Sequence, residues 1–165
     1  MEISNLTDQQ IKTMIMNYDA AGKAEGGLFS LANLLKEQAL RSRSDWVVRA
    51  VVSKILELSR SSLDGKLSYK ALWEHFCPDQ PWIGHGSLKV VGKSLGKVIG
   101  YCATHKLPVL TVLVVRQGER RLSPDAVQNI FDESKRYGID VGYDPQAFVK
   151  QQEEKARALR DADLP

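Results

Sequence analysis

The chain is poor in cysteine and has no long apolar run, and each of these absences excludes a class of protein. Only Cys77 and Cys102 are cysteine among its 165 residues, so a disulfide-stapled secreted scaffold is excluded and a reducing compartment is expected. No apolar run approaches the roughly 18 residues that cross a bilayer. Residues 1–5 have neither the basic nor the apolar region of a signal peptide. The sequence therefore predicts a cytoplasmic protein without a membrane partner.

Charge of one sign is only in small excess. The formal net charge is +3, which is too little to identify an anionic partner by itself. The distribution is more informative, because residues 81–121 contain a single acid, Glu119, among several basic residues. These are Lys89, Lys93, Lys97, Lys106, Arg116, Arg120 and Arg121. Since the residues after Asp132 are acidic on balance, this asymmetry is typical of a phosphate-binding surface, although an ordinary solvated face accounts for it equally well.

The spacing of the apolar residues predicts a mostly helical fold. Helices are expected over residues 7–18, 28–39, 45–58, 71–77 and 87–104, where apolar side chains recur every three or four positions. The third of these is rich in β-branched residues, which leaves a strand possible there, and Asp45 is its expected cap. Two further helices should start at Ser123-Pro124 and Asp144-Pro145, where a capping side chain precedes a proline.

One segment, residues 106–116, is expected to be a β-strand buried on both faces, because it is a nearly continuous run of valine and leucine. Residues 67–69 form either a short strand or the start of a helix. The turn at residues 61–65 separates an N-terminal helical segment, residues 1–62, from a unit of residues 63–165. We expect both to belong to one compact domain of the mixed α/β class.

The expected helix over residues 87–104 has three faces. Its core stripe is formed by Leu88, Val91, Leu95, Val98 and Cys102. Lys89, Lys93 and Lys97 recur every four residues and should project as one basic row. Gly92, Gly96 and Gly100 recur beside that row, and each interior glycine costs about 1 kcal/mol relative to alanine. Close packing of another backbone explains these glycines, and so does the close approach of a ligand such as a nucleic-acid phosphate chain.

Three short segments carry a family resemblance. They are Leu67-Ser68-Tyr69-Lys70-Ala71-Leu72, Lys89-Val90-Val91-Gly92-Lys93-Ser94-Leu95, and Pro108-Val109-Leu110 with Val114-Val115-Arg116-Gln117-Gly118. Together they resemble the winged-helix domain of the alkylguanine-DNA alkyltransferases and the alkyltransferase-like proteins, over about 50 of the 165 residues. The resemblance implies a winged-helix-like centre between the N-terminal and C-terminal helices. It also implies that Tyr69 stands for the family's nucleotide-rotating tyrosine and Lys89 for its base-replacing arginine.

The sequence departs from this family at the reactive centre. Where the family has Pro-Cys-His-Arg before Val-Val, this chain has Leu110-Thr111-Val112-Leu113. Without a nucleophilic cysteine and a histidine to activate it, alkyl transfer is excluded on this alignment. The alkyltransferase-like proteins also lack the cysteine but keep the His-Arg pair, so this chain lacks the residues implied for lesion reading. Without those residues, the resemblance implies only an architecture. This is a helix-turn-helix-like pair with a basic second helix, followed by a strand and a possible wing at residues 116–121.

Other residue types with possible functions favour structural roles. His75, Cys77, Cys102 and His105 would make a four-ligand zinc set on paper, but Cys102 fits the core stripe, and we expect no metal and no cofactor. Residues 82–87 form a glycine-rich start to the long helix and serve as a loop and cap, with a phosphate contact through Ser87 as the alternative. Of the three tryptophans Trp46, Trp73 and Trp82, the last is expected to be the most exposed.

The sequence as a whole predicts a non-catalytic nucleic-acid-binding module, most simply one that binds DNA. The residues expected to contact nucleic acid are Tyr69, Trp82, Ser87, Lys89, Lys93, Lys97, Arg116, Arg120 and Arg121. The alternative is a protein-interaction or inhibitory factor that receives a partner helix on its Gly92-Gly96-Gly100 row. An enzyme whose site is scattered along the chain is a distant third.

Overall fold

The computed structural model describes residues 2–41 and 46–165, which form seven α-helices, three short 3-10 helices and one small sheet. The elements are η1 (Ile3–Asn5), α1 (Asp8–Ala21), α2 (Leu31–Arg41), α3 (Val48–Arg60), β1 (Leu67–Ser68), α4 (Tyr69–Phe76), α5 (His85–His105), η2 (Leu110–Leu113), β2 (Val114–Val115), α6 (Pro124–Arg136), α7 (Pro145–Ala158) and η3 (Asp161–Asp163). The protein is thus a mostly helical member of the mixed α/β class, as predicted. No helix within the described ranges combines the length and the apolarity needed to cross a membrane.

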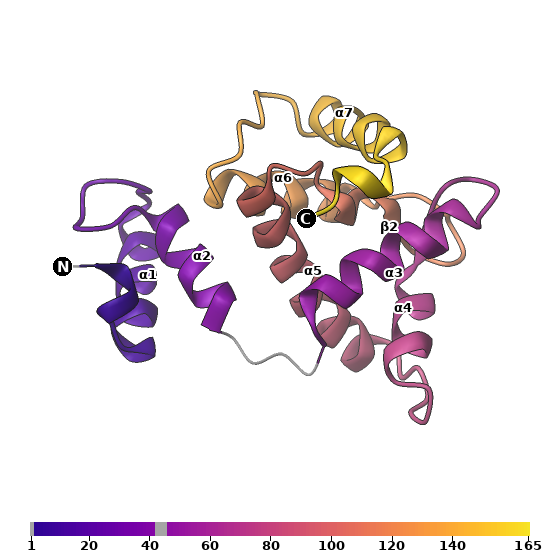
Figure 1. Ribbon diagram of the computed structural model, residues 1–165, viewed down its shortest axis with the longest axis horizontal. Coiled ribbons are helices and arrows are strands. Elements are labelled where there is room, and N and C mark those ends of the chain that lie inside the picture. Colours follow the sequence, from indigo (N-terminus) through magenta and orange to yellow (C-terminus); the bar gives the residue numbers. More distant parts are fainter. Residues whose placement is uncertain (1, 42–45) are drawn as a thin grey trace.

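The long helix α5 is the centre of the fold. It packs against α2, α3, α4, α6 and η2, and Figure 1 shows α1 and α2 together at one end of the molecule and α7 near the C-terminus on another side. The core stripe behaves as predicted at its centre, since Val91, Val98 and Cys102 are fully buried. One continuous hydrophobic core runs from Leu6 to Ala156, so residues 1–62 share their core with the rest of the chain.

The starts of several helices follow from their capping residues. The Thr7 hydroxyl accepts a hydrogen bond from the Gln10 N–H while the Gln10 side chain accepts one from the Thr7 N–H, the reciprocal pair called a capping box. Ser123 and Asp144 cap α6 and α7 in front of their prolines, as predicted. The expected cap Asp45 lies outside the described residues. The helix α3 that follows confirms the helical interpretation of its segment over the strand alternative.

The prediction of one long strand over residues 106–116 is wrong. Leu110–Leu113 form the 3-10 helix η2, and only Val114–Val115 are strand. A strand needs a partner for its backbone groups, and the partner strand β1 is two residues long because Ser68 already caps α4. The run from Val109 to Val115 is nevertheless buried throughout. The apolar sequence therefore indicated burial correctly, but not the extended backbone.

The turn that follows β2 is held in place by Arg120. Its guanidinium donates to the Asp64 carboxylate at 2.7 and 2.9 Å, to the Ser62 hydroxyl at 3.0 Å and to the Lys66 carbonyl at 2.9 Å. Arg120 also has a left-handed backbone, with φ of 54°, which disfavours any residue with a Cβ. These hydrogen bonds offset that cost and fix residues 116–121 against the loop between α3 and β1.

The Arg120–Asp64 contact predicts a specific dependence of stability on pH. The hydrogen bond from Arg120, followed by that from Ser62, holds the pKa of the Asp64 carboxyl well below its ordinary value. The contact therefore contributes its full stability above about pH 4, the pKa of an unfolded aspartate, and loses it as the pH falls toward the lowered pKa. Between about pH 4 and pH 2, the melting temperature of the wild type should fall more steeply than that of Asp64→Asn. Glu154→Gln, an exposed change on α7, serves as the control, and parallel curves for wild type and Asp64→Asn would contradict the prediction.

Candidate nucleic-acid interface

The two short strands bring Tyr69 and Arg116 together. β1 and β2 pair in parallel with Leu67 opposite Val114 and Ser68 opposite Val115, so the next residues in this register are Tyr69 and Arg116. Burial raises the pKa of the Tyr69 hydroxyl, and the nearby positive charge of Arg116 lowers it in part. Arg116 is exposed, so its guanidinium stands at the surface next to a half-buried phenol. The resemblance had singled out the tyrosine, and the charge distribution had singled out the arginine.

These two residues line a groove between α5 and α6. The groove has a volume of about 300 Å³ and also contains Gly92 and Gly96 of α5 and Ser123 and Asn129 on the α6 side. A Cβ placed on either glycine would meet no other atom within 4 Å. The bare backbone of α5 therefore forms one open wall of the groove, as the ligand interpretation of these two glycines requires.

A buried hydroxyl also lines this groove. Thr111 in η2 is 2% exposed, and its Oγ1 atom has no hydrogen-bond partner. A buried hydroxyl without a partner costs about 1–3 kcal/mol, so such atoms are uncommon in folded proteins. Because Thr111 is part of the groove lining, a ligand group that donates or accepts a hydrogen bond would satisfy it. Sequence reasoning did not propose Thr111 as a site residue, since a lone threonine in an apolar run carries no signal of its own.

The groove has a positive and a negative side. Arg116 carries the positive charge on the β2 side, whereas Asp125 and Glu133 of α6 line the opposite wall. The Glu133 carboxylate is already paired with the Arg136 guanidinium at 2.7 Å. The net field over the groove is therefore mixed, and strong attraction for phosphate has to come from basic residues outside it.

The basic row on α5 is shorter than predicted. Lys89 and Lys93 are exposed, but Lys97 is 9% exposed and belongs to the buried residues of the helix. A four-residue step advances about 40° around an α-helix, so the row rotates away from its first member. The part of α5 around Lys97 is also enclosed, with every residue from Lys97 to Gly100 buried. The prediction that Lys97 projects with the other two lysines is wrong.

The glycine row is divided in the same way. A Cβ at Gly100 would lie 2.8 Å from Cε1 of Tyr137, a distance at which one of the two groups must move. Gly100 is therefore explained by internal packing against the residue that ends α6, whereas Gly92 and Gly96 face open space. The packing explanation is confirmed for Gly100, whereas Gly92 and Gly96 have no internal neighbour that explains them.

The remaining candidate residues are separate from the groove. The Ser87 hydroxyl accepts a hydrogen bond from the Ile83 N–H at 2.9 Å, and Ser87 is fully buried, so it ties the loop before α5 to the first turn of the helix. Trp82 is half-buried with its ring edge-on to Trp73 at 6.3 Å, and it is the least buried tryptophan, as predicted. Arg120 is engaged with Asp64. Arg121 is exposed in the same turn.

The four zinc ligands that the sequence offered, His75, Cys77, Cys102 and His105, do not form a metal site in this fold. Within residues 2–41 and 46–165 there is no group of three or more His, Cys, Asp or Glu side chains arranged to hold a metal ion. Cys102 is fully buried in the core, and burial raises the pKa of its thiol to about 11. Its side chain is therefore a neutral thiol in the core.

Comparison with family models, curated proteins and solved structures finds no match for this chain.

Proposed function

We propose that the protein is a non-catalytic nucleic-acid-binding module whose ligand is duplex DNA. The observation that carries the proposal is a set of exposed cations: Lys89 and Lys93 on α5, Arg116 at the end of β2 and in the groove lining, and Arg121 in the following turn. All four belong to the basic stretch of the sequence, and none makes an ion pair within the described residues. Cations in such an arrangement contact successive phosphates without reading the bases.

The exposed cations contact only phosphates. The Tyr69–Arg116 pair and the Thr111 hydroxyl add polar groups that can form hydrogen bonds with other parts of a nucleotide. Each lies in the groove beside bare helix backbone, where a nucleotide can approach closely. In the family resemblance, Thr111 stands where the alkyltransferases have their nucleophilic cysteine. A threonine hydroxyl with no histidine beside it donates or accepts a hydrogen bond but is not an activated nucleophile. This supports binding without chemistry.

The salt dependence of binding tests the proposal directly. Four phosphate contacts should give a plot of log affinity against log salt concentration with a slope of roughly −3 to −4 on a duplex of random sequence. Fluorescence anisotropy with labelled duplex, single strand and RNA measures the slope and ranks the three ligands. If none of them binds at low salt, the nucleic-acid proposal is wrong.

One observation favours a second candidate, a protein-interaction module. The open wall at Gly92 and Gly96 is continuous with Leu88 and Leu95, which also line the groove. A partner helix could therefore pack against α5 at close range, as helices do where small residues recur every four positions. Binding of this kind would depend weakly on salt, in contrast to phosphate binding.

A further inference from the structure

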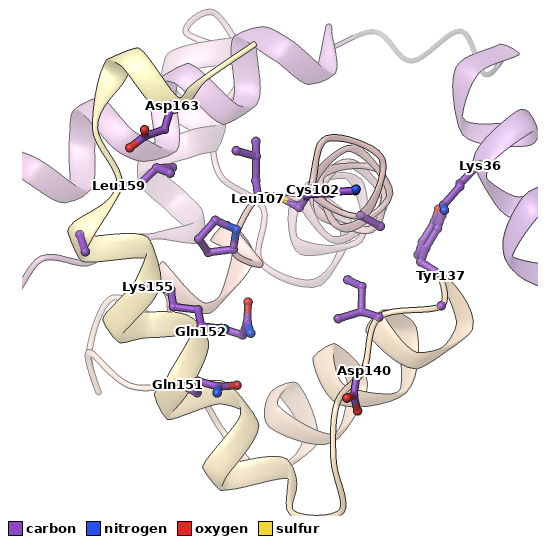
Figure 2. A pocket seen from close by; sticks show the side chains of 16 residues that line it. Lys36, Cys102, Leu107, Tyr137, Asp140, Gln151, Gln152, Lys155, Leu159 and Asp163 are labelled. Carbon is purple, nitrogen blue, oxygen red and sulfur yellow. The ribbon is translucent and has the colours of Figure 1, made fainter.

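A second and larger cavity lies at the opposite end of α5 from the exposed lysines. It has a volume of about 640 Å³ and is bounded by α2, the C-terminal end of α5, the segment after α6, and α7. Figure 2 shows Lys36 on one side of it and Gln151, Gln152 and Lys155 on the other. The residues of the proposed nucleic-acid interface take no part in its lining, so it is a separate site.

Three lysines from three different elements line this cavity. They are Lys36 of α2, Lys106 after α5 and Lys155 of α7. Within the described part of the chain none of their ammonium groups forms an ion pair or hydrogen bond. Lys36 is partly buried and Lys106 and Lys155 are exposed, so an anion in the cavity would meet positive charge from three elements of the fold.

The two acids in the lining are already engaged. The Asp163 carboxylate accepts a hydrogen bond from the Arg160 N–H at 2.9 Å and lies 3.5 Å from the Arg160 guanidinium. The backbone hydrogen bond is the main reason that the pKa of Asp163 is lowered. Asp140 accepts from the Gly142 N–H at 3.2 Å. Because a cation of the chain neutralises Asp163, the charge left for a ligand to meet is positive.

The side-chain amide of Gln152 adds a hydrogen-bond donor of fixed orientation to the site. Gln152 is 7% exposed, and its Oε1 accepts a hydrogen bond from the Val109 N–H at 2.9 Å. This bond fixes which side of the amide is oxygen, so the Nε2 group stands on the other side. Figure 2 shows the Gln152 side chain extending from α7 toward the middle of the cavity. A donor fixed in this way is suited to an anionic oxygen.

Lys106 occupies its position at a conformational cost. It ends α5 in the left-handed region, with φ of 54°, at a position where glycine is the usual residue. A lysine there stabilises the C-terminal end of the helix dipole, and it also supplies a cation to the cavity. Backbone strain of this kind is enriched at functional sites.

From these observations we infer that the cavity binds a small organic anion. The lysines and the Gln152 amide meet its carboxylate or phosphate group, while Leu107, Pro108 and Ile139 contact its apolar part. Since the lining comes from α2 as well as α5 and α7, the bound anion holds the N-terminal helices against the rest of the chain. The ligand therefore stabilises the folded protein in proportion to its occupancy.

Thermal unfolding of the full chain tests this inference. Inorganic phosphate, adenosine monophosphate and citrate are compared at ionic strength matched with sodium chloride, and at least one should raise the melting temperature above the salt control. A response to the two phosphates assigns a phosphate group to the ligand, and a response to citrate alone assigns a carboxylate. If none of the three raises the melting temperature beyond sodium chloride, the inference is overturned.

Two variants locate the response. Lys155→Gln removes one cation, and Lys106→Gly removes another while replacing a strained residue by the one that prefers its backbone, so the second variant should fold at least as well as wild type. Each should weaken binding of the responding anion about tenfold, as expected for the loss of one charge-assisted contact. Lys150→Gln, an exposed change on α7 outside the cavity, is the matched control. Unchanged binding in both variants would place the anion elsewhere and refute the assignment.

Discussion

Reversing the charges of Lys89 and Lys93 together is expected to lower the affinity for duplex DNA roughly 100-fold at low salt, since each charge-assisted contact contributes about 1.5 kcal/mol or more. Both side chains are exposed on the first half of α5, so Lys89→Glu/Lys93→Glu should unfold at the temperature of the wild type within a few degrees. The slope of log affinity against log salt concentration should become less steep by roughly 2, because about two phosphate contacts are lost. Fluorescence anisotropy and thermal unfolding measure the two effects separately.

The control for this variant carries the same change in net charge. Lys12→Glu/Lys150→Glu reverses two exposed lysines on α1 and α7, away from the groove, and should lose little affinity. Equal losses in the two double variants would mean that net charge, and not the surface around Arg116, determines binding. Lys97 is left out of the test because it is buried, and a carboxylate there would destabilise the fold.

The second large effect concerns stability. Gly92→Ala/Gly96→Ala should raise the free energy of unfolding by about 2 kcal/mol, because each change removes a glycine from a helix interior at no steric cost. Gly100→Ala should instead lower it by about 1 kcal/mol, since overpacking against Tyr137 costs more than the helix propensity returns. Chemical denaturation of the three proteins measures both signs. Equal stabilisation at all three glycines would show that Tyr137 moves away without cost.

The same double variant separates the two candidate functions. Two methyl groups on the open wall of the groove leave Lys89, Lys93 and Arg116 unchanged, so DNA affinity should fall less than it does on charge reversal. A partner helix packed against that wall would be displaced by the methyl groups. A variant that keeps its DNA affinity but loses a captured protein partner would therefore favour the protein-interaction function.

Local signals predicted the helices well. The caps at Thr7, Ser123 and Asp144 give each helix a start that depends only on neighbouring residues, and all three are present. The long helix was also recognised, because its core stripe repeats over many turns. The prediction of a strand over residues 106–116 failed. Apolar residues in a short buried run fit a 3-10 helix as well as a strand when no long partner strand is available.

The candidate site was predicted only in part, because its geometry depends on contacts between distant residues. The periodicity of α5 shows which side chains share a face, but not that packing encloses residues 97–100 and buries Lys97. Arg120 contacts Asp64 across 56 residues, and no local pattern indicates that pairing. Tyr69 and Arg116 were each proposed, yet their proximity follows from a strand register that the sequence does not contain.

That register also sets how the chain can change in length. A strand alternates its side chains between two faces, so one residue added between Val114 and Arg116 would either turn Arg116 away from Tyr69 or break the pairing of β1 with β2. The loop between α1 and α2 has no such constraint, since it is exposed over most of its length. Insertions and deletions in related chains should therefore gather in that loop and be missing from β2 and from the step between β2 and Arg116.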